Sequence, residues 1–93
     1  MARPLSSESV FRALAHPTRR SIVLALRSGE SPASKILPNN LSSKPAVSMH
    51  LRALQHAGVI SFRRKGTSLI YHINRQALRP VEQFLDAMNS SRG

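Results

Sequence analysis

Cysteine is absent from this 93-residue sequence, and long hydrophobic runs are absent as well. Without cysteine there are no disulfides, no thiolate metal sites and no cysteine nucleophiles, and nothing indicates an oxidising compartment. No apolar run approaches the roughly 20 residues that a helix needs to cross a bilayer. The first residues, MARPLSSESV, lack the apolar segment of a secretion signal. We therefore expect a cytoplasmic protein that does not bind membranes.

Acidic residues are scarce and are missing from the middle of the chain. Four Asp and Glu stand against fourteen Lys and Arg, which gives a formal net charge of +10. No acid lies between Glu30 and Glu82, a span that holds eight Lys and Arg. Such a basic span predicts a polyanionic partner. A membrane surface fits less well, because the basic residues do not line one long amphipathic helix.

Catalytic patterns are lacking too. The sequence has no nucleophile elbow, no phosphate-binding glycine loop and no convincing pair of catalytic acids. A chain of this length forms one small domain with a modest core and little room for a substrate pocket. We expect a single domain over residues 1–93, with loose ends at 1–6 and 89–93, and neither enzymatic activity nor a cofactor.

Helical spacing covers the first part of the chain. A first helix is expected from Ser7, because serine is a favoured residue at a helix start. A second helix should begin at Pro17, with His16 at its N-cap position, and end at Gly29. A short third helix is expected from Ser31, followed by a fourth and better defined helix.

The fourth helix is predicted from Ser43 to Ala57. At 100° per residue its apolar positions fall within a stripe about 60° wide. These positions are Val47, Leu51, Leu54 and Gly58. Gly58 should close the helix, and His50 at the border of the stripe is expected to anchor it by a hydrogen bond.

Two strands, VISFRR and LIYHI, are predicted around a tight turn at Lys65 and Gly66. Asn74 is expected to cap a final helix, which Pro80 should kink or delay to about residue 79. The element order is helix, helix, helix, helix, strand, strand, helix. This is a mainly α fold with a β-hairpin (α+β), the arrangement of a winged helix-turn-helix.

DNA binding is predicted for the fourth helix and the hairpin. The major groove admits an α-helix, whose N-terminal half then contacts base edges. Candidate contacts on the helix are Ser43, Lys44, Pro45, Ser48, Met49 and Arg52. The hairpin tip would contact phosphates or the minor groove through Arg63, Arg64, Lys65 and Thr67.

Both ends of the chain carry apolar side chains that suit a homodimer. These residues are Val10, Phe11 and Leu14 in the first helix and Val81, Phe84, Leu85 and Met88 in the last. A symmetric dimer through the two helices would place its recognition helices about 34 Å apart, over an inverted-repeat operator. The alternative is that these residues only cover the core of the monomer.

Three blocks resemble the ArsR/SmtB family of bacterial repressors: ALAHPTRRSIVLAL, SKPAVSMHLRALQHAGVI and RRKGTSLIYHIN. The resemblance covers roughly residues 10 to 88. It implies a homodimeric winged helix-turn-helix regulator, usually a repressor that an inducing signal releases from DNA. The chain resembles members without metal-sensing cysteines, of the autorepressor type.

Metal sensing in this family implies cysteine pairs before the recognition helix, or Asp and His ligands on the last helix. The chain has no cysteine, and Glu82 and Asp86 have no histidine beside them on the last helix. Two carboxylates make a weak transition-metal site. We expect no metal, and control by an inducer or partner protein that the sequence does not identify.

Two other function classes stay open. A basic protein of this size could bind nucleic acid without sequence preference, as an architectural or RNA-binding protein. The fold could also be a protein-interaction module that does not bind DNA. Sequence-specific binding to a palindromic operator would distinguish a repressor from both of these alternatives.

Overall fold

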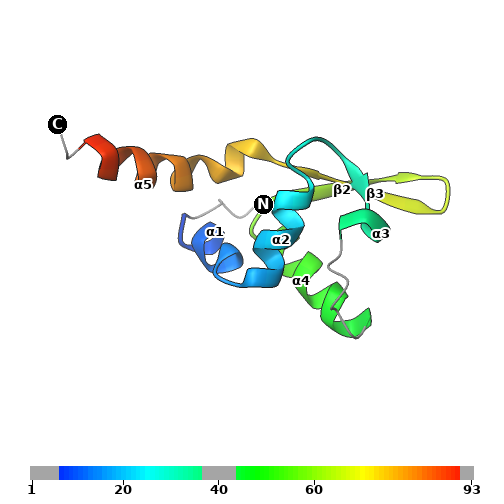
Figure 1. The fold of residues 1–93 in the computed structure, drawn as a ribbon. Coiled ribbons are helices and arrows are strands. Elements are labelled where there is room, and N and C mark those ends of the chain that lie inside the picture. The colour runs from blue at the N-terminus through cyan, green and yellow to red at the C-terminus, as the bar shows by residue number, and fades with distance from the viewer. Residues whose placement is uncertain (1–6, 37–43, 91–93) are drawn as a thin grey trace, which may run out of the picture.

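The computed structural model describes residues 7–36 and 44–90. In chain order the elements are α1 (Ser7–Leu14), α2 (Pro17–Ala25), β1 (Ser31–Pro32), α3 (Ala33–Ile36), α4 (Lys44–His56), β2 (Ile60–Lys65), β3 (Ser68–Ile73), the 3₁₀ turn η1 (Arg75–Leu78) and α5 (Arg79–Ser90). Figure 1 shows α1, α2 and α4 between two projections, α5 on one side and the β2–β3 hairpin on the other. The predicted mainly α fold with a β-hairpin is confirmed.

The sheet has three antiparallel strands in the order β1-β3-β2. Lys65 pairs with Ser68, which leaves a two-residue turn whose Gly66 has a φ of 62°, a conformation that suits glycine. The expected third helix start is wrong, because Ser31 and Pro32 form β1 against β3 and α3 begins one residue later. Proline is tolerated there because β1 is an edge strand.

Helix α2 begins as predicted and ends early. His16 is its N-cap, and His16 Nδ1 accepts a hydrogen bond from the Thr18 backbone N–H at 3.3 Å. The expected end at Gly29 is wrong, since the helix stops at Ala25. Successive backbone bonds from residues 26, 27 and 29 reach carbonyls only three positions back, at 3.0 to 3.2 Å. These tight turns replace the last part of the expected helix.

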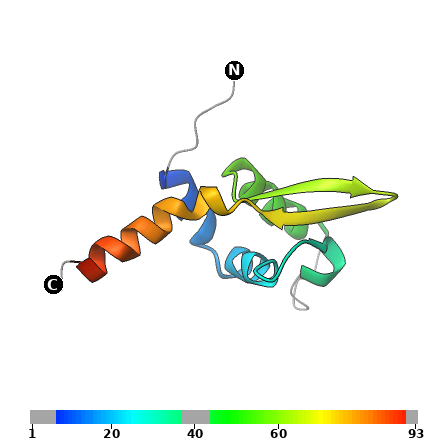
Figure 2. The same cartoon turned by 90° about the horizontal axis from the view of Figure 1, so that it is seen from above.

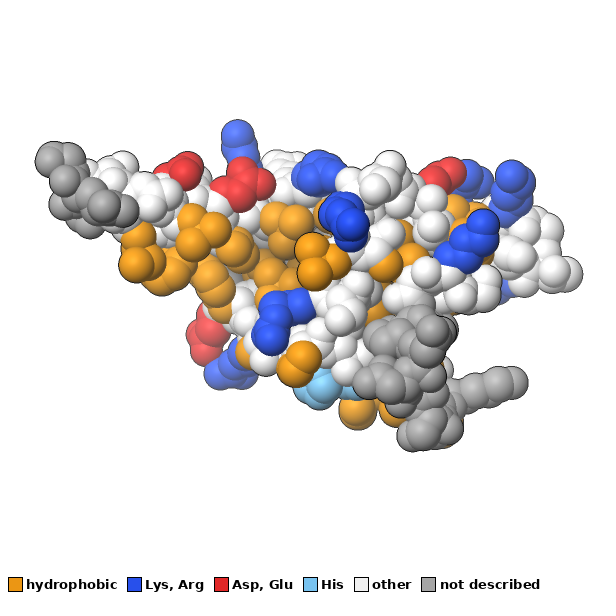
Figure 3. All heavy atoms as spheres, in the orientation of Figure 1, with side chains coloured by type: hydrophobic (Ala, Val, Ile, Leu, Met, Phe, Trp, Pro, Cys, Tyr) orange, Lys and Arg blue, Asp and Glu red, His pale blue; other side chains and the backbone are white. Residues whose placement is uncertain are grey.

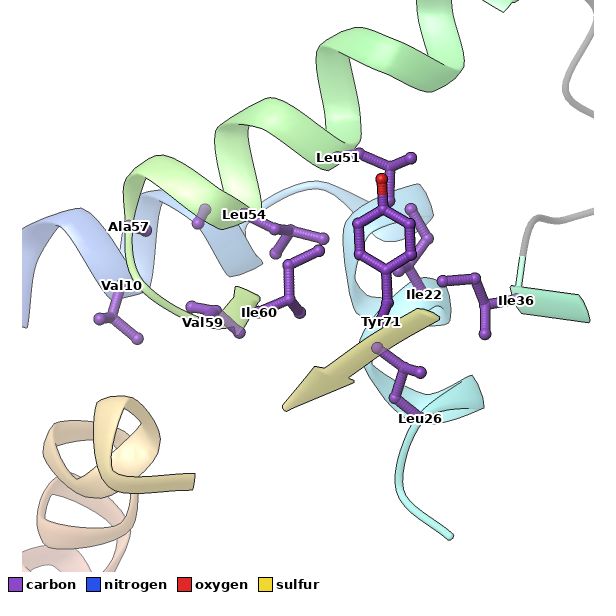
Figure 4. Packing of buried hydrophobic residues seen from close by; sticks show 11 residues of the cluster. Val10, Ile22, Leu26, Ile36, Leu51, Leu54, Ala57, Val59, Ile60 and Tyr71 are labelled. Atoms are coloured by element: carbon purple, nitrogen blue, oxygen red, sulfur yellow. The ribbon is translucent and has the colours of Figure 1, made fainter. Parts of the chain in front are cut away.

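The core is formed where α4, α2 and the sheet meet. Figure 4 shows Tyr71 of β3 lying among side chains from α2, α3 and α4. The predicted stripe on α4 is confirmed, because Leu51 and Leu54 are buried and Val47 packs partly against them. Gly58 closes α4 with a φ of 78°, and the next backbone N–H, that of residue 59, bonds back to residue 54 at 3.0 Å.

The connection from the sheet to α5 differs in one respect from the prediction. Helix α5 begins at Arg79, as Pro80 predicts. Asn74 precedes η1, but the expected side-chain cap is wrong. Its amide nitrogen instead donates to the Gly58 carbonyl and to Ser61 Oγ, both at 2.8 Å.

Helix α5 projects from the body and has no buried residue. It packs on α1 through an edge-to-face contact between Phe11 and Phe84, whose ring centroids are 5.8 Å apart. The helix includes Asn89 and Ser90, which were expected in a loose end. None of the described helices is long and apolar enough to cross a membrane.

Candidate DNA-binding surface

The outward face of α4 carries most of the predicted base-contacting residues. Pro45, Ser48, Met49 and Arg52 are all exposed, Met49 to 56%. Lys44 is the first residue of the helix, while Ser43, its expected cap, lies outside the described residues. The described part of α4 therefore presents a thioether and a guanidinium opposite its buried side, with the Ser48 hydroxyl on one flank.

His50 fixes α4 to α2. Its side chain is only 4% exposed, and its Nδ1 accepts a hydrogen bond from Arg19 Nε at 3.3 Å. The His50 and His16 rings are in contact, with centroids 4.4 Å apart. Burial, together with the neighbouring His16 and Arg19, lowers the pKa of His50, which favours the neutral ring that can accept this bond. The predicted anchoring role is confirmed.

Arg19 and Arg20 of α2 both make intramolecular hydrogen bonds. Arg19 binds His50, and Arg20 Nη1 donates to the Leu14 carbonyl at 2.9 Å. The first bond joins α2 to α4 and the second joins α2 to the end of α1. The Arg19 bond stabilises the position of α4, the Arg20 bond stabilises the packing of α2 on α1, and both arginines therefore act as structural residues.

The β2–β3 hairpin forms the wing. In Figure 2 it extends away from α5 and beyond the other described elements. Arg63, Arg64, Lys65 and Thr67 are all exposed near its tip. Because successive strand residues point to opposite faces, Arg64 lies on the core-facing side of the sheet, and its two neighbours lie on the other side.

Arg63 has an acidic partner that sequence reasoning missed. Its Nε donates to Glu30 Oε2 at 3.3 Å, and its Nη2 donates to Oε1 at 2.5 Å. The hydrogen bond from Arg63 holds the pKa of the Glu30 carboxyl below its usual range. Over residues 7–36 and 44–90, Arg64 and Lys65 have no such ion pair. The three wing cations are therefore not equivalent.

Phe62 is a second wing residue that the sequence did not single out. It is 45% exposed and leans on Tyr71, with ring centroids 5.7 Å apart. Strand alternation places it on the same face as Arg64. Phe62 is two residues after the buried Ile60 in β2, so strand alternation is the one sequence signal that could have placed it on this face. An exposed ring therefore lies on the same face of the wing as Arg64, whose guanidinium has no ion pair within the described residues.

An apolar face runs along α5 and onto α2. Figure 3 shows hydrophobic side chains gathered along this side of the molecule. The large exposed ones in α1, α2 and α5 are Phe11, Leu24, Phe84, Leu85 and Met88. The sequence did not single out Leu24 of α2, which is 58% exposed.

A shallow hollow of about 310 Å³ continues this face between α2 and α5. Its lining residues are Leu14, Arg20, Val23, Leu24, Leu78, Val81 and Glu82. Leu14 and Val81, two residues predicted for the dimer interface, are half-buried and lie at the edge of the apolar face. Val10, predicted for the interface, is 1% exposed and belongs to the core of the monomer. Neighbouring side chains of the same molecule cover Val10, so it is not part of the exposed face.

The two acids of α5 are not grouped with further metal-ligating side chains among the described residues. Glu82 and Asp86 are exposed and four positions apart. No group of three or more His, Cys, Asp or Glu that could hold a metal ion occurs within 7–36 and 44–90.

Known proteins resemble this chain in sequence and in fold. The profile of a helix-turn-helix domain matches residues 14–61. The transcriptional repressor SdpR of Bacillus subtilis (strain 168) is 41% identical over 71 residues, which are 76% of this chain and 79% of that protein. The arsenical resistance operon repressor of Staphylococcus xylosus is 29% identical over 83 residues, 89% of this chain and 80% of that protein.

Solved structures of transcriptional regulators have the same fold as this chain. A crystal structure of an ArsR family transcriptional regulator superposes with a TM-score of 0.79 at 25% identity, over 97% of this chain and 94% of that one. A possible transcriptional regulator for arsenical resistance gives 0.71 at 32% identity, over 83% and 80%. These relatives are regulators and not enzymes. The chain belongs to the ArsR/SmtB family of winged helix-turn-helix transcriptional regulators, as its three sequence blocks predict.

Proposed function

We propose that this regulator is a homodimeric repressor that binds an inverted-repeat DNA operator. The observation that carries the proposal is the division of α4 into a buried side and an exposed side. Leu51 and Leu54 hold the helix, which leaves Ser48, Met49 and Arg52 free to enter a major groove. Two of the relatives are named repressors, which supports the direction of regulation.

Each exposed side chain of α4 suits a particular DNA contact. Ser48 can donate to or accept from a base edge, and Arg52 can bind a guanine or a phosphate. Met49 can pack on a thymine methyl group or on a sugar. Lys44, the first residue of α4, would bind the phosphate backbone through its backbone N–H, and Ser43 before it in the sequence is proposed to do the same. Pro45 has no N–H and could contact DNA only through its ring.

The wing supplies contacts that carry less sequence information. Arg64, Lys65 and Thr67 would bind phosphates or the minor groove beside the base pairs that α4 contacts. The excess of positive charge raises the rate and the affinity of association with any duplex. Sequence preference therefore has to come mainly from α4.

The apolar face of α1, α2 and α5 is the dimer interface in this proposal. A second copy would cover Phe11, Leu24, Phe84, Leu85 and Met88, side chains that are 39% to 58% exposed in the monomer. A two-fold axis through α5 would present two copies of α4 to successive major grooves, about 34 Å apart. The dimer would work in the bacterial cytoplasm on the nucleoid, without a cofactor.

Selection of bound sequences from a random DNA pool tests the proposal. A specific dimer should enrich an inverted repeat, and single base changes in a half-site should cost about 1–3 kcal/mol. Enrichment of one unpaired half-site would contradict the dimer. Uniform recovery of unrelated duplexes at physiological salt would favour a non-specific nucleic-acid-binding protein instead.

A further inference from the structure

A second hollow lies on the side of α5 that faces away from the apolar face. Its volume is about 520 Å³, within the range of roughly 300–1,000 Å³ that small-molecule sites occupy. It lies between the α4–β2 turn, η1 and the start of α5. Its lining residues are Val10, Gly58, Asn74, Gln76, Ala77, Arg79, Pro80 and Gln83.

The position of this pocket on α5 leaves it clear of the proposed dimer interface. Arg79 and Gln83 are one turn apart and therefore share a side of the helix. Val81, Leu85 and Met88 follow helical spacing along the opposite side. Dimerisation through the apolar face would therefore not fill the pocket.

The lining divides into an apolar floor and a polar rim. Val10 and Ala77 are buried and form the floor, and Figure 4 shows the Val10 side chain pointing from α1 toward the ribbon of η1 and α5. Gln76, Arg79 and Gln83 are exposed. Arg79 is the only charged residue of the lining and has no ion pair in the described part of the chain. The pocket therefore suits a ligand with one anionic end and a small apolar body.

The pocket also borders the joint between α4 and the wing. Asn74 bonds to the Gly58 carbonyl at the end of α4 and to Ser61 Oγ in β2, and its backbone N–H donates to the carbonyl of residue 59 at 2.9 Å. Gly58 and Asn74 both line the pocket. A molecule bound there would lie beside the hydrogen bonds that join the end of α4 and the start of the wing to Asn74, the residue before η1.

We propose that this pocket binds small amphipathic carboxylates and that their binding changes the affinity for DNA. The carboxylate would accept paired hydrogen bonds from the Arg79 guanidinium, with Gln76 or Gln83 donating a further one. The apolar body would lie against Pro80, the partly exposed apolar residue of the lining, above the buried Val10 and Ala77. The binding step is independent of the function proposed above, and only the effect on DNA rests on that function.

Titration of the ¹⁵N-labelled full chain with benzoate tests the binding step. Benzoate should shift the amide signals of Gly58, Asn74, Ala77 and Gln83, while benzamide, its neutral analogue, should shift them far less. Arg79→Gln should weaken benzoate binding at least about tenfold, because a charge-assisted pair of hydrogen bonds is lost. Lys35→Gln on α3 removes the same charge outside the pocket and should bind benzoate like the unmodified chain.

Any of the following results would overturn the binding site. They are the absence of saturable shifts at these residues, equal effects of benzoate and benzamide, and unchanged binding by Arg79→Gln. Shifts spread evenly over all basic segments would mean general ion binding and would also overturn it.

The effect on DNA needs a second measurement, with a sequence recovered from the random pool. Saturating benzoate should change the affinity of the unmodified chain severalfold and leave that of Arg79→Gln unchanged. Benzoate binding without any change in DNA affinity would overturn the coupling. Failure of the chain to bind DNA at all would overturn the proposed function and leave the pocket standing.

Discussion

Arg63 in the wing is bound through two nitrogens by Glu30, a residue 33 positions earlier in the chain. The pair joins β2 to the residue that precedes β1 and partly neutralises one of three neighbouring wing cations. Its side chains are 51% and 47% exposed, so solvent screens the pair and its contribution to stability is small. Its larger consequence concerns DNA, because a phosphate would have to compete with Glu30 for Arg63.

Glu30→Gln should strengthen DNA binding across all sequences. The change frees Arg63 for a phosphate and should steepen the salt dependence of affinity by about one ion. Fluorescence anisotropy over a series of salt concentrations measures both effects. Glu8→Gln is the matched control, because Glu8 pairs with Arg12 within α1, outside the wing. An equal gain from both variants would mean that only net charge matters.

Arg64→Ala should weaken DNA binding more than Arg63→Ala. Arg64 has no ion pair in the described residues, whereas Arg63 is already engaged. The loss should be similar for specific and unrelated duplexes and should reduce the salt slope by about one. If Arg63→Ala has the larger effect in the same titration, the assignment of roles within the wing is wrong.

Met49→Ala and Ser48→Ala should relax base preference at individual operator positions. Both side chains are exposed on α4, so the folded state should change little. Each lost base contact should reduce discrimination at its position by about 1–3 kcal/mol. Competition with single-base operator variants measures this. His56→Ala, an exposed change at the other end of α4, should preserve every preference. Unchanged preferences in the Met49 and Ser48 variants would exclude both residues from base contact.

Stability should fall as the pH drops below about 6.5, the ordinary pKa of histidine. Burial lowers the pKa of His50 in the folded state, so the unfolded chain binds a proton more readily and acid favours unfolding. Protonation would also remove the acceptor for Arg19. His50→Gln keeps an acceptor that does not titrate, so its stability should change less between about pH 7 and pH 5.

Urea unfolding at several pH values measures this dependence, with His56→Gln as the control. His56 is exposed at the end of α4, so its replacement should leave the dependence intact. A dependence that is as steep in His50→Gln as in the unmodified chain would contradict the assignment to His50.

Leu85→Glu should convert the proposed dimer to a monomer. The substitution places an unpaired charge in an apolar interface and should weaken association at least about a hundredfold. Light scattering after size-exclusion chromatography measures the mass in solution. Gln83→Glu, on the opposite side of α5, should remain dimeric. A dimer that survives Leu85→Glu would exclude this face of α5 as the interface.

Much of this fold could be predicted from the sequence, because local patterns determine it. The stripe on α4, the hairpin turn at Gly66 and the start of α5 at Arg79 follow from spacing and from proline and glycine stereochemistry. Strand β1 could not be predicted, since two residues have no periodicity and Ser31 and Pro32 are extended only by pairing with β3.

The contacts of the site that the sequence did not predict also depend on pairing between distant segments. The Glu30–Arg63 pair and the bonds of Asn74 to Gly58 join positions far apart in the sequence. Asparagine is a favoured helix-capping residue, but in the folded chain the Asn74 side chain bonds instead to the Gly58 carbonyl and to Ser61 Oγ. Exposure of Leu24 likewise depends on where α5 lies, which the pattern of α2 does not contain.

The two sides of α4 have a consequence for the divergence of such regulators. The buried side of the helix packs on the domain through His50, Leu51 and Leu54. The exposed side carries Ser48, Met49 and Arg52, which contribute little to the buried core. Substitutions on the outer side can therefore accumulate at little cost to the native state. A duplicated gene could acquire a new operator through a few changes there, and an engineer could retarget the protein by the same route.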